Sequence, residues 1–592
     1  MRGADPFILL DDARPGGAPA RLYRAPVRVV EAARVDEVRP ALEEVRHATR
    51  GGLHAAGYLA YGAGAAFEPA APPPRDDGPL IWFGLFDRWE ELPGDAVPTL
   101  LPDPAGVWVG RPEPCIDRGA YRDAFARVLE LIRAGDVYQA NLSFRAELPF
   151  QGDPMALYAA LRARAGAGWG AIVRTGAETI LSFSPELFFA LDGGRLTARP
   201  MKGTARRGST PADDRAAAAA LAADAKQRAE NLMIVDLIRN DLARVAAAGS
   251  VAVPELFVVE TYPTVHQMVS TVSAELAEGR DAADVLAAAF PCGSITGAPK
   301  PRAMQVIDAV EAGPRRRVYT GSIGRIDADG SAGFNVAIRT LVVREGESHA
   351  TMGLGSGVVA DSSVDEEWDE CLAKGAFTRA GDRRFDLIET MAFDPEEGVA
   401  LLDGHLGRMG ASAELFGFAF DRHAVRNELQ AATFRLRAPA RLRLLLARSG
   451  AVAIEVGPLP PMPAAPVEVA VTPLPVHAQD YRLRHKTTDR GFYDKARREA
   501  GAFEVVFEDG EGRLTEGSFT SLFVARDGRL VTPPLVRGLL PGVLRAALIA
   551  DGRAVEGELT PDDLRDGFLL GNALRGLVPA VLAVAKGPDA PV

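Results

Sequence analysis

A break in the apolar pattern at residues 376–384 divides this chain into two parts. The stretch is rich in charge and shows no apolar periodicity, whereas helical and strand-like patterns precede and follow it. A chain of 592 residues is also too long for one hydrophobic core, because single cores rarely serve more than about 300 residues. We therefore expect an N-terminal domain over 1–375, a linker over 376–384 and a C-terminal domain over 385–592.

The composition limits the classes of function. Hydrophobic residues make up 47% of the chain and charged residues 25%, as in ordinary soluble proteins. The net charge of −12 argues against nucleic-acid binding, no apolar run is long enough for a membrane span, and the start, residues 1–6, lacks the apolar core of a signal peptide. The three cysteines, Cys115, Cys292 and Cys371, are far apart. This spacing favours a reducing cytoplasm over a disulfide framework.

One lysine stands out in the stretch from Arg199 to Thr204. Pro200 cannot donate to a sheet, Gly203 allows a close turn, and Lys202 lies between them. Neighbouring arginines would disfavour the protonated ammonium, which would make this lysine a better nucleophile. The alternative is a solvated lysine in a surface turn, and these six residues alone favour it.

Two glutamates lie at the edges of apolar elements. Glu186 follows a strand predicted over 179–183, where partial burial would raise its pKa and suit a general acid. A solvated carboxylate at the strand end is equally compatible. Glu230 borders the apolar face of a long helix predicted over 213–245. It would either pair with Lys226, four residues earlier, or bind a hard cation.

Other polar residues give weaker signals. A lone histidine such as His266 is more often structural than catalytic. The glycine-rich loop over 291–300 opens a helix and so favours an anion, but such loops are common. Arg339 lies on a strand predicted over 335–341. A tight loop over 353–357 precedes an acidic helix over 364–377, in which Glu370 and Lys374 form a routine stabilising pair.

The motifs of residues 1–375 resemble those of the chorismate-utilising enzymes, a family that includes anthranilate, aminodeoxychorismate, isochorismate and salicylate synthases. Many motifs occur in the family's order, which makes the resemblance specific. They are Gly135–Ser143, Ser184–Glu186, Arg199–Thr204, Ala229–Asn231, Gly293–Lys300, Tyr319–Gly324, Ala337–Thr340 and Gly353–Lys374. The resemblance implies an α+β fold, with a large domain of two subdomains whose sheets are covered by helices.

Two positions separate the branches of this family. Isochorismate-type members carry a lysine that activates water where this chain has Gln139, and anthranilate synthases carry alanine where it has Lys202. The resemblance therefore implies the aminodeoxychorismate synthase branch. In that branch Lys202 would attack carbon 2 of chorismate while Glu186 protonates the hydroxyl leaving carbon 4. Ammonia would then add at carbon 4 and expel the lysine.

The same resemblance implies a set of binding residues. Glu230 and Glu370 would hold Mg²⁺ on the ring carboxylate, and His266 would lie near the reacting ring. The carboxylates of the substrate would be bound by Thr296, Tyr319, Arg339, Lys374 and the amides around Gly355 and Gly357.

Residues 385–592 resemble the class IV pyridoxal-phosphate enzymes, which include 4-amino-4-deoxychorismate lyase, and this implies a second, smaller α+β domain. Lys486 matches the lysine that bonds to pyridoxal 5′-phosphate, and Glu516 matches the carboxylate at its pyridine nitrogen. Arg408 and the amides of Val543 and Leu544 match the phosphate cradle, and residues 572–576 match a late motif on the substrate side. Lyases and aminotransferases share all of these residues.

The order of the two halves favours one combination. The product of an aminodeoxychorismate synthase is the substrate of the lyase, so the chain would convert chorismate and ammonia to 4-aminobenzoate, the folate precursor, and pyruvate. One alternative is an anthranilate synthase fused to a D-amino-acid or branched-chain aminotransferase. Another is a non-catalytic scaffold of the same fold. No Gly-x-Cys-x-Gly motif occurs, which predicts a separate class I glutamine amidotransferase subunit, and the class IV resemblance predicts a homodimer.

Overall fold

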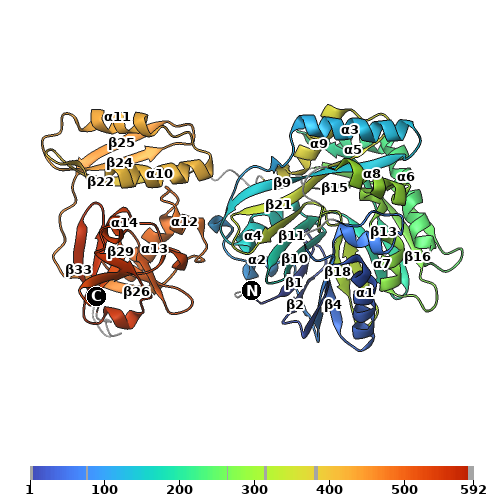
Figure 1. The fold of residues 1–592 in the computed structure, drawn as a ribbon, viewed down its shortest axis with the longest axis horizontal. Helices are drawn as coiled ribbons and strands as arrows, with labels where there is room; N and C mark the ends of the chain where they lie inside the picture. Colours follow the sequence, from blue (N-terminus) through green and yellow to red (C-terminus); the bar gives the residue numbers. More distant parts are fainter. Residues whose placement is uncertain (1–4, 75–77, 263–264, 312–315, 379–384, 584–592) are drawn as a thin grey trace. The chain divides into compact units, whose positions relative to one another are not determined.

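The computed structural model describes residues 5–74, 78–262, 265–311, 316–378 and 385–583. They form two compact units, made mainly of the residues before and after position 380. Each unit contains sheets covered by helices (Figure 1), and the predicted α+β class is confirmed. Within the described ranges, no helix is both long and apolar enough to cross a membrane.

The larger unit contains two sheets. In the first, the strands run in the order β17–β9–β21–β20–β11–β10–β1–β2–β6, and β7 and β8 pair with β9. Their bounds are β1 (Phe7–Asp11), β2 (Ala20–Arg24), β6 (Glu90–Leu92), β7 (Trp108–Val109), β8 (Glu113–Pro114), β9 (Gln139–Gln151), β10 (Trp169–Arg174), β11 (Glu178–Ser184), β17 (Gly297–Ala298), β20 (Thr340–Arg344) and β21 (His349–Val358).

The second sheet of this unit runs in the order β14–β16–β13–β12–β19–β18–β4–β5–β3, and β15 pairs with β16. Its strands are β3 (Arg28–Ala32), β4 (His54–Leu59), β5 (Ile81–Phe86), β12 (Leu187–Asp192), β13 (Arg195–Arg199), β14 (Met201–Arg206), β15 (Ala252–Thr261), β16 (Val265–Glu275), β18 (Ser322–Ile326) and β19 (Ala332–Asn335).

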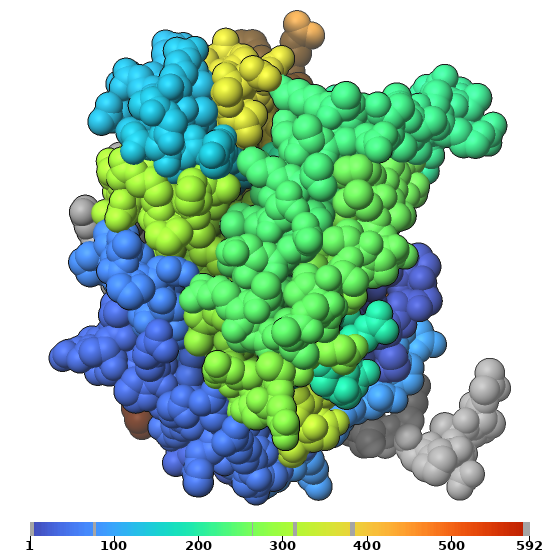
Figure 2. Space-filling model, turned by 90° about the vertical axis from the view of Figure 1, so that its right-hand side faces the viewer, coloured from blue at the N-terminus to red at the C-terminus, as the bar shows by residue number. Residues whose placement is uncertain are grey.

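Helices bury the apolar faces of both sheets. They are α1 (Val35–Arg50), α2 (Val97–Leu100), α3 (Arg118–Arg133), α4 (Pro154–Ala165), α5 (Pro211–Ala223), α6 (Ala225–Ala243), α7 (Ala282–Ala289), α8 (Lys300–Val310) and α9 (Val364–Lys374), with short 3₁₀ turns η1 (Tyr61–Ala66), η2 (Pro104–Gly106), η3 (Gly293–Ile295) and η4 (Ala376–Thr378). Helix α6 packs on β14 and β16, and α9 packs on β21. The segment that contains α5 and α6, in green, crosses the face shown in Figure 2.

The smaller unit has two sheets as well. The first runs β23–β22–β24–β25 and the second β28–β27–β26–β33–β32–β29–β30–β31. The strands are β22 (Leu387–Asp394), β23 (Gly398–Val399), β24 (Ala440–Leu446), β25 (Val452–Pro458), β26 (Val467–Pro473), β27 (Glu504–Glu508), β28 (Leu514–Gly517), β29 (Ser521–Arg526), β30 (Arg529–Thr532), β31 (Ala554–Glu556), β32 (Phe568–Asn572) and β33 (Gly576–Leu582). The helices are α10 (Leu402–Phe416), α11 (Arg422–Thr433), α12 (Tyr481–Arg484), α13 (Gly491–Ala500) and α14 (Val543–Ala550), with 3₁₀ turns η5 (Leu535–Arg537) and η6 (Pro561–Leu564).

The predicted helix over 213–245 was wrong in one respect, because the chain forms two helices there. Asp224 adopts an extended conformation between α5 and α6, and its side chain accepts hydrogen bonds from the amides of Lys226 and Gln227. An aspartate that satisfies free amides in this way is a strong helix start. The break sets the direction of α6 independently of α5, and α6 is the helix that carries Glu230.

Three other predicted elements differ from the structure. The strand over 335–341 is interrupted: β19 ends at Asn335, β20 begins at Thr340, and Arg339 between them has a φ of 50°. The tight loop over 353–357 is part of strand β21. The helix over 364–377 ends at Lys374, and residues 376–378, assigned to the linker, form η4. The rest of the predicted linker, 379–384, lies outside the described residues.

Candidate functional site

Lys202 lies on β14, at the end of the second sheet, and its side chain reaches α6. Its Nζ is 3.1 Å from a carboxylate oxygen of Glu230, and the two side chains are only 22% and 15% exposed. Asn231, the next residue on α6, donates to the carbonyl oxygen of Lys202 (3.2 Å) and accepts from the hydroxyl of Ser270 on β16 (2.6 Å). Helix α6 therefore fixes both the backbone and the amine of Lys202.

The surroundings of this lysine differ from the sequence prediction. Lys202 lies in a strand rather than in a surface turn, and two of the neighbouring arginines, Arg199 and Arg207, are held by carboxylates. Arg199 binds Glu260 at 2.6 Å and Arg207 binds Asp214 at 2.7 Å. The described residues show no ion pair between Glu230 and Lys226. The carboxylate of Glu230 pairs with Lys202 rather than with Lys226.

Strand β21 and helix α9 bring further predicted residues to the same place. A Cβ added to Gly357 would lie 3.2 Å from Lys202 Nζ and 2.9 Å from Gln139 Nε2, so the amine lies directly over this glycine. Lys374 donates to the carbonyl oxygen of Gly355 (2.8 Å) and pairs with Glu370 (2.8 Å). Although burial acts in the opposite direction, Lys374 and Lys202 lower the pKa of Glu370.

Glu186 is a buried carboxyl group at the end of β11, with 3% of its surface exposed. Burial raises its pKa to about 7, although the Ser294 hydroxyl, 2.7 Å away, and the amide of Met201 favour the charged form. The solvated alternative for this residue was therefore wrong. Near neutral pH a substantial fraction of Glu186 carries a proton that it can donate.

The guanidinium group of Arg339 has no acidic partner in the described part of the chain. Among the described residues, no hydrogen bond or ion pair engages its side chain, and burial lowers its pKa. Its positive φ keeps it outside both neighbouring strands. A desolvated cation of this kind is suited to an anionic ligand such as a carboxylate.

Tyr319 and Thr296 are buried in the same unit. A Cβ added to Gly353 would lie 2.1 Å from the ring of Tyr319, so only glycine lets the ring pack on β21. The Thr296 hydroxyl donates to the carbonyl oxygen of Cys292 at 2.8 Å. Their roles in binding the substrate carboxylates stay predictions.

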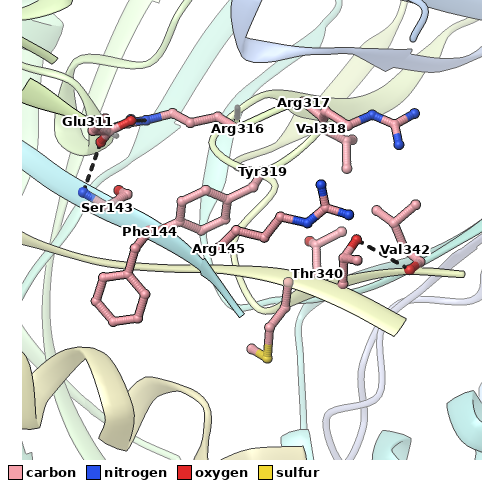
Figure 3. A pocket seen from close by; sticks show the side chains of 13 residues that line it. Ser143, Phe144, Arg145, Glu311, Arg316, Arg317, Val318, Tyr319, Thr340 and Val342 are labelled. Carbon is pink, nitrogen blue, oxygen red and sulfur yellow. Dashed lines mark hydrogen bonds and ion pairs between the residues drawn. The ribbon is translucent and has the colours of Figure 1, made fainter. Parts of the chain in front are cut away.

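Tyr319 also borders a cavity of about 30 Å³, drawn in Figure 3. Arg145 and Arg316 line this cavity, and Glu311 accepts from the amide of Ser143 (2.8 Å) and binds the guanidinium of Arg316 (2.5 Å). A cavity of this size has room for one or two waters. It is therefore too small to be the site of a chorismate-sized substrate.

His266 makes its contacts away from Lys202. Its ring lies 3.0 Å from the hydroxyl of Thr261 and 2.9 Å from a carboxylate oxygen of Asp214. Its neighbour Gln267 instead donates to the carbonyl oxygen of Gly203 (2.8 Å), next to Lys202. Sequence reasoning missed Gln267, Ser294 and Asn231, although each has a polar side chain inside or beside a motif. The position of His266 near a reacting ring stays a prediction.

A magnesium ion would need oxygen ligands here. The described residues contain no group of three or more His, Cys, Asp or Glu side chains that could hold a metal. Mg²⁺ is usually bound through one or two carboxylates together with oxygen atoms of the substrate and water. Glu230 and Glu370 both lie near Lys202, so they fit an ion that binds together with an anionic substrate.

The smaller unit contains a cavity of about 480 Å³ in which the predicted cofactor residues meet: Arg408, Lys486, Glu516, Val543 and Leu544 all line it. Burial lowers the pKa of Lys486 to about 8. The carboxyl group of Glu516 accepts from the hydroxyl of Tyr493 (2.6 Å), and burial raises its pKa to about 7.

These residues fit pyridoxal phosphate. The cavity offers an amine of lowered pKa, a carboxyl group and the first amides of α14, which suit a phosphate. His405 also lines it, and its Nε2 is buried without a hydrogen-bond partner. The guanidinium of Arg408, a predicted phosphate ligand, also binds Glu389 (2.6 and 2.8 Å) and the carbonyl oxygen of Pro541 (3.0 Å).

Comparison with known proteins finds two families, one along each part of the chain. The family described as chorismate binding enzyme matches residues 6–380, and the family described as amino-transferase class IV matches residues 386–582. Aminodeoxychorismate synthase component 1 of Escherichia coli (strain K12) is 46% identical over 257 residues, which are 43% of this chain and 56% of that protein. The chain thus spans little more than half the length of this curated relative.

Two further comparisons limit what sequence identity can decide. Anthranilate synthase component 1 1 of Haloarcula marismortui is 43% identical over 275 residues, which are 46% of this chain and 56% of that protein. The crystal structure of anthranilate synthase component I from Streptococcus pneumoniae covers 62% of this chain and 93% of its own, with a TM-score of 0.53 and 24% identity. This structural likeness shows the fold alone. The chain belongs to the chorismate-binding enzyme family, and it carries an amino-transferase class IV domain after the chorismate-binding part.

Proposed function

We propose that the N-terminal unit aminates chorismate at carbon 4 through a covalent adduct with Lys202. The observation that carries the proposal is the position of Lys202 Nζ, 3.1 Å from Glu230 and directly over Gly357. Relatives named aminodeoxychorismate synthase and anthranilate synthase match at similar identity. The identity of residue 202 therefore supports the choice between them better than overall similarity does.

The site residues can divide the work of this reaction. The ammonium of Lys202 loses a proton to solvent, and the free amine attacks carbon 2 of the ring. Glu186 gives its proton to the hydroxyl that leaves carbon 4 as water. Ammonia then adds at carbon 4 as the bond between carbon 2 and the lysine breaks. Lys374 and Arg339 would bind the substrate carboxylates, with Glu230 and Glu370 holding Mg²⁺.

For the C-terminal unit we propose elimination of pyruvate from the aminated product, which yields 4-aminobenzoate. Bound pyridoxal phosphate would supply an electron sink for the carbon that bears the amine. Lys486, with its pKa lowered by burial to about 8, can take the ring proton from that carbon near neutral pH. The enolpyruvyl group then leaves as pyruvate and the ring becomes aromatic.

The partners of the chain belong to the same proposal. Ammonia would come from a separate class I glutamine amidotransferase subunit, and the smaller unit would form a homodimer. The rival combination is an anthranilate synthase with an aminotransferase, which predicts anthranilate and no free pyruvate from the second step. A non-catalytic scaffold predicts no turnover of chorismate.

One incubation tests these functions. The protein is mixed with chorismate, ammonium, Mg²⁺ and pyridoxal phosphate, and the products are read by mass spectrometry. We expect 4-aminobenzoate and pyruvate. In Lys486→Ala the 4-amino-4-deoxy intermediate should accumulate, and in Lys202→Ala carbon 4 amination should collapse. Anthranilate as the main product of the unaltered chain would overturn the assignment of the first half.

A further inference from the structure

The cavity of the smaller unit has a large excess of positive charge. Its lining contains a single carboxylate, Glu516, and six cationic side chains: Arg408, Arg441, Lys486, Arg490, Arg497 and Arg575. A phosphate group brings about two negative charges, and Arg408 is already bound to Glu389. After the phosphate of the cofactor is bound, several of these cationic side chains therefore remain to bind a second anionic group.

Two of these arginines lie against the same aromatic ring. The guanidinium carbon of Arg497, on α13, is 5.1 Å from the centroid of the Phe519 ring, and that of Arg575 is 5.5 Å from it. Both distances allow a cation–π attraction. Like charges placed this close repel one another. The arrangement becomes favourable when an anion binds between them.

Buried polar residues fix this arrangement. Glu504, fully buried on β27, accepts from the amides of Ser518 (3.0 Å) and Phe519 (3.1 Å) and so holds the loop that presents the ring. Asn572 accepts from the amide of Arg575 (2.9 Å) and donates to the carbonyl oxygen of Phe519 (3.2 Å). The ring and the hairpin that carries Arg575 are therefore joined.

Arg575 has no acidic partner among the described residues. Its Nε is buried and makes no hydrogen bond, and among the described residues no carboxylate pairs with its guanidinium. Burial lowers its pKa, Glu504 acts in the opposite direction, and Arg497 adds to the lowering. Arg497 shares one nitrogen with Asp494 at 3.1 Å, and its side chain remains 32% exposed. An unpaired donor in this position costs free energy unless a ligand satisfies it.

We propose that Arg497 and Arg575, packed on Phe519, form a carboxylate subsite that makes this cavity selective for dianionic amino substrates. The proposal rests on the proposed function, because the aminated form of chorismate keeps both of its carboxylates. Guanidinium groups bind carboxylates through paired hydrogen bonds. A branched-chain amino acid has one carboxylate and an apolar side chain, and it would leave this pair of cations unsatisfied.

The test uses the full chain loaded with pyridoxal phosphate, and isophthalate and benzoate as probes with two carboxylates and one. Affinities are measured by isothermal titration. We expect isophthalate to bind at least tenfold more tightly than benzoate, and Arg575→Gln or Arg497→Gln to remove most of this preference. Arg565→Gln, on an exposed side chain of the same unit, is the matched control and should keep it. Arg497 is partly exposed, so Arg497→Gln should fold normally. It therefore still tests the subsite if Arg575→Gln fails to fold.

Kinetics and titration with the cofactor distinguish failure of the carboxylate subsite from failure of the proposed lyase function. With the aminated substrate, Arg575→Gln should raise KM at least tenfold and change kcat less than threefold, while cofactor affinity stays within twofold. Loss of cofactor affinity with an unchanged preference for isophthalate would assign the arginines to the phosphate and overturn the subsite. An intact preference in both variants would overturn it too. If the preference depends on the arginines but no pyruvate is released, the subsite stands and the proposed lyase function fails.

Discussion

Glu186 illustrates how the environment of one residue sets its chemistry. The residue is a carboxyl group at a strand end, and only its burial, with the hydroxyl of Ser294 at 2.7 Å, brings its pKa to about 7. The same side chain in water would be ionised at neutral pH. Its proposed use as a proton donor therefore depends on residues far apart in the chain.

This pKa predicts the pH profile of the first reaction. The folded pKa is raised from 4.5 to about 7, so the donor form is present below pH 7 and is lost as the pH rises through that value. At a constant concentration of free ammonia, kcat/KM for chorismate should fall about tenfold per pH unit above 7. Glu186→Gln should lower the rate by about 10²–10⁴-fold and abolish this limb. A profile unchanged in the variant would exclude Glu186 as the acid.

At the scale of secondary-structure elements, the position of Lys202 depends on the packing of helix α6 against strands β14 and β16. Asn231 is 1% exposed and bridges β14 and β16 by bonding to Lys202 and Ser270. Because the helix carries both this bridge and Glu230, a shift of α6 would move the carboxylate away from the amine. The precision of the site is thus a property of helix packing as much as of the lysine itself.

The bridge can be removed by a single substitution. Asn231→Ala leaves the carbonyl oxygen of Lys202 and the hydroxyl of Ser270 without their partner, which should cost about 1–3 kcal/mol of stability. The amination rate should fall as well, whereas pyruvate release from supplied aminated substrate should not. Thermal unfolding and the two assays check this. Asn240→Ala, on the exposed side of the same helix, should change neither quantity.

A second element-scale prediction concerns the backbone of β14. Gly203 has a φ of +102°, and an added Cβ would lie 3.1 Å from the side chain of Gln227 on α6. Gly203→Ala should therefore destabilise the unit by about 1–2 kcal/mol and slow amination. Gly333→Ala on β19 is the control, because its added Cβ meets no atom within 4 Å. A stable and fully active Gly203→Ala would mean that β14 tolerates another conformation.

Sequence patterns predicted where several helices and strands lie, but not which side chains these elements bring into contact. The strand predicted over 179–183 lies within β11, and the acidic helix predicted from residue 364 begins there as α9, so apolar spacing and turn residues located both. The break at Asp224 and the positive φ of Arg339 depend on a capping bond and on tertiary packing, which no local pattern reports. In the same way, Lys226 is the nearer partner of Glu230 in sequence, but the fold brings Lys202 to it.

At the scale of the whole molecule, the two candidate sites lie in two units with separate apolar cores. Lys202 and Lys486 therefore belong to different sites. We predict that Lys202→Ala keeps pyruvate release from supplied aminated substrate, and that Lys486→Ala keeps consumption of chorismate. Assays of each half-reaction check this. Loss of both activities in either variant would show that one site depends on the other.

Mixing the two variants then tests how the intermediate travels. If it diffuses through solvent, equal amounts of Lys202→Ala and Lys486→Ala should together form 4-aminobenzoate after a lag that shortens as protein concentration rises. The lag follows because the intermediate must accumulate before the second site is supplied. Product formation is followed by fluorescence. A mixture that forms none, although both half-reactions are active, would mean that the intermediate passes only within one molecule.

The ring of Tyr319 lies where a side chain on residue 353 would have to be, within 2.1 Å of its Cβ position. Position 353 is thus closed to every other amino acid for as long as an aromatic residue occupies 319. Substitutions at the two positions are therefore coupled. A smaller side chain must first replace Tyr319 before residue 353 can carry a side chain. A saturation library at 353 should recover glycine alone in the unaltered chain, and should accept alanine or serine once Tyr319 has been replaced by a small residue.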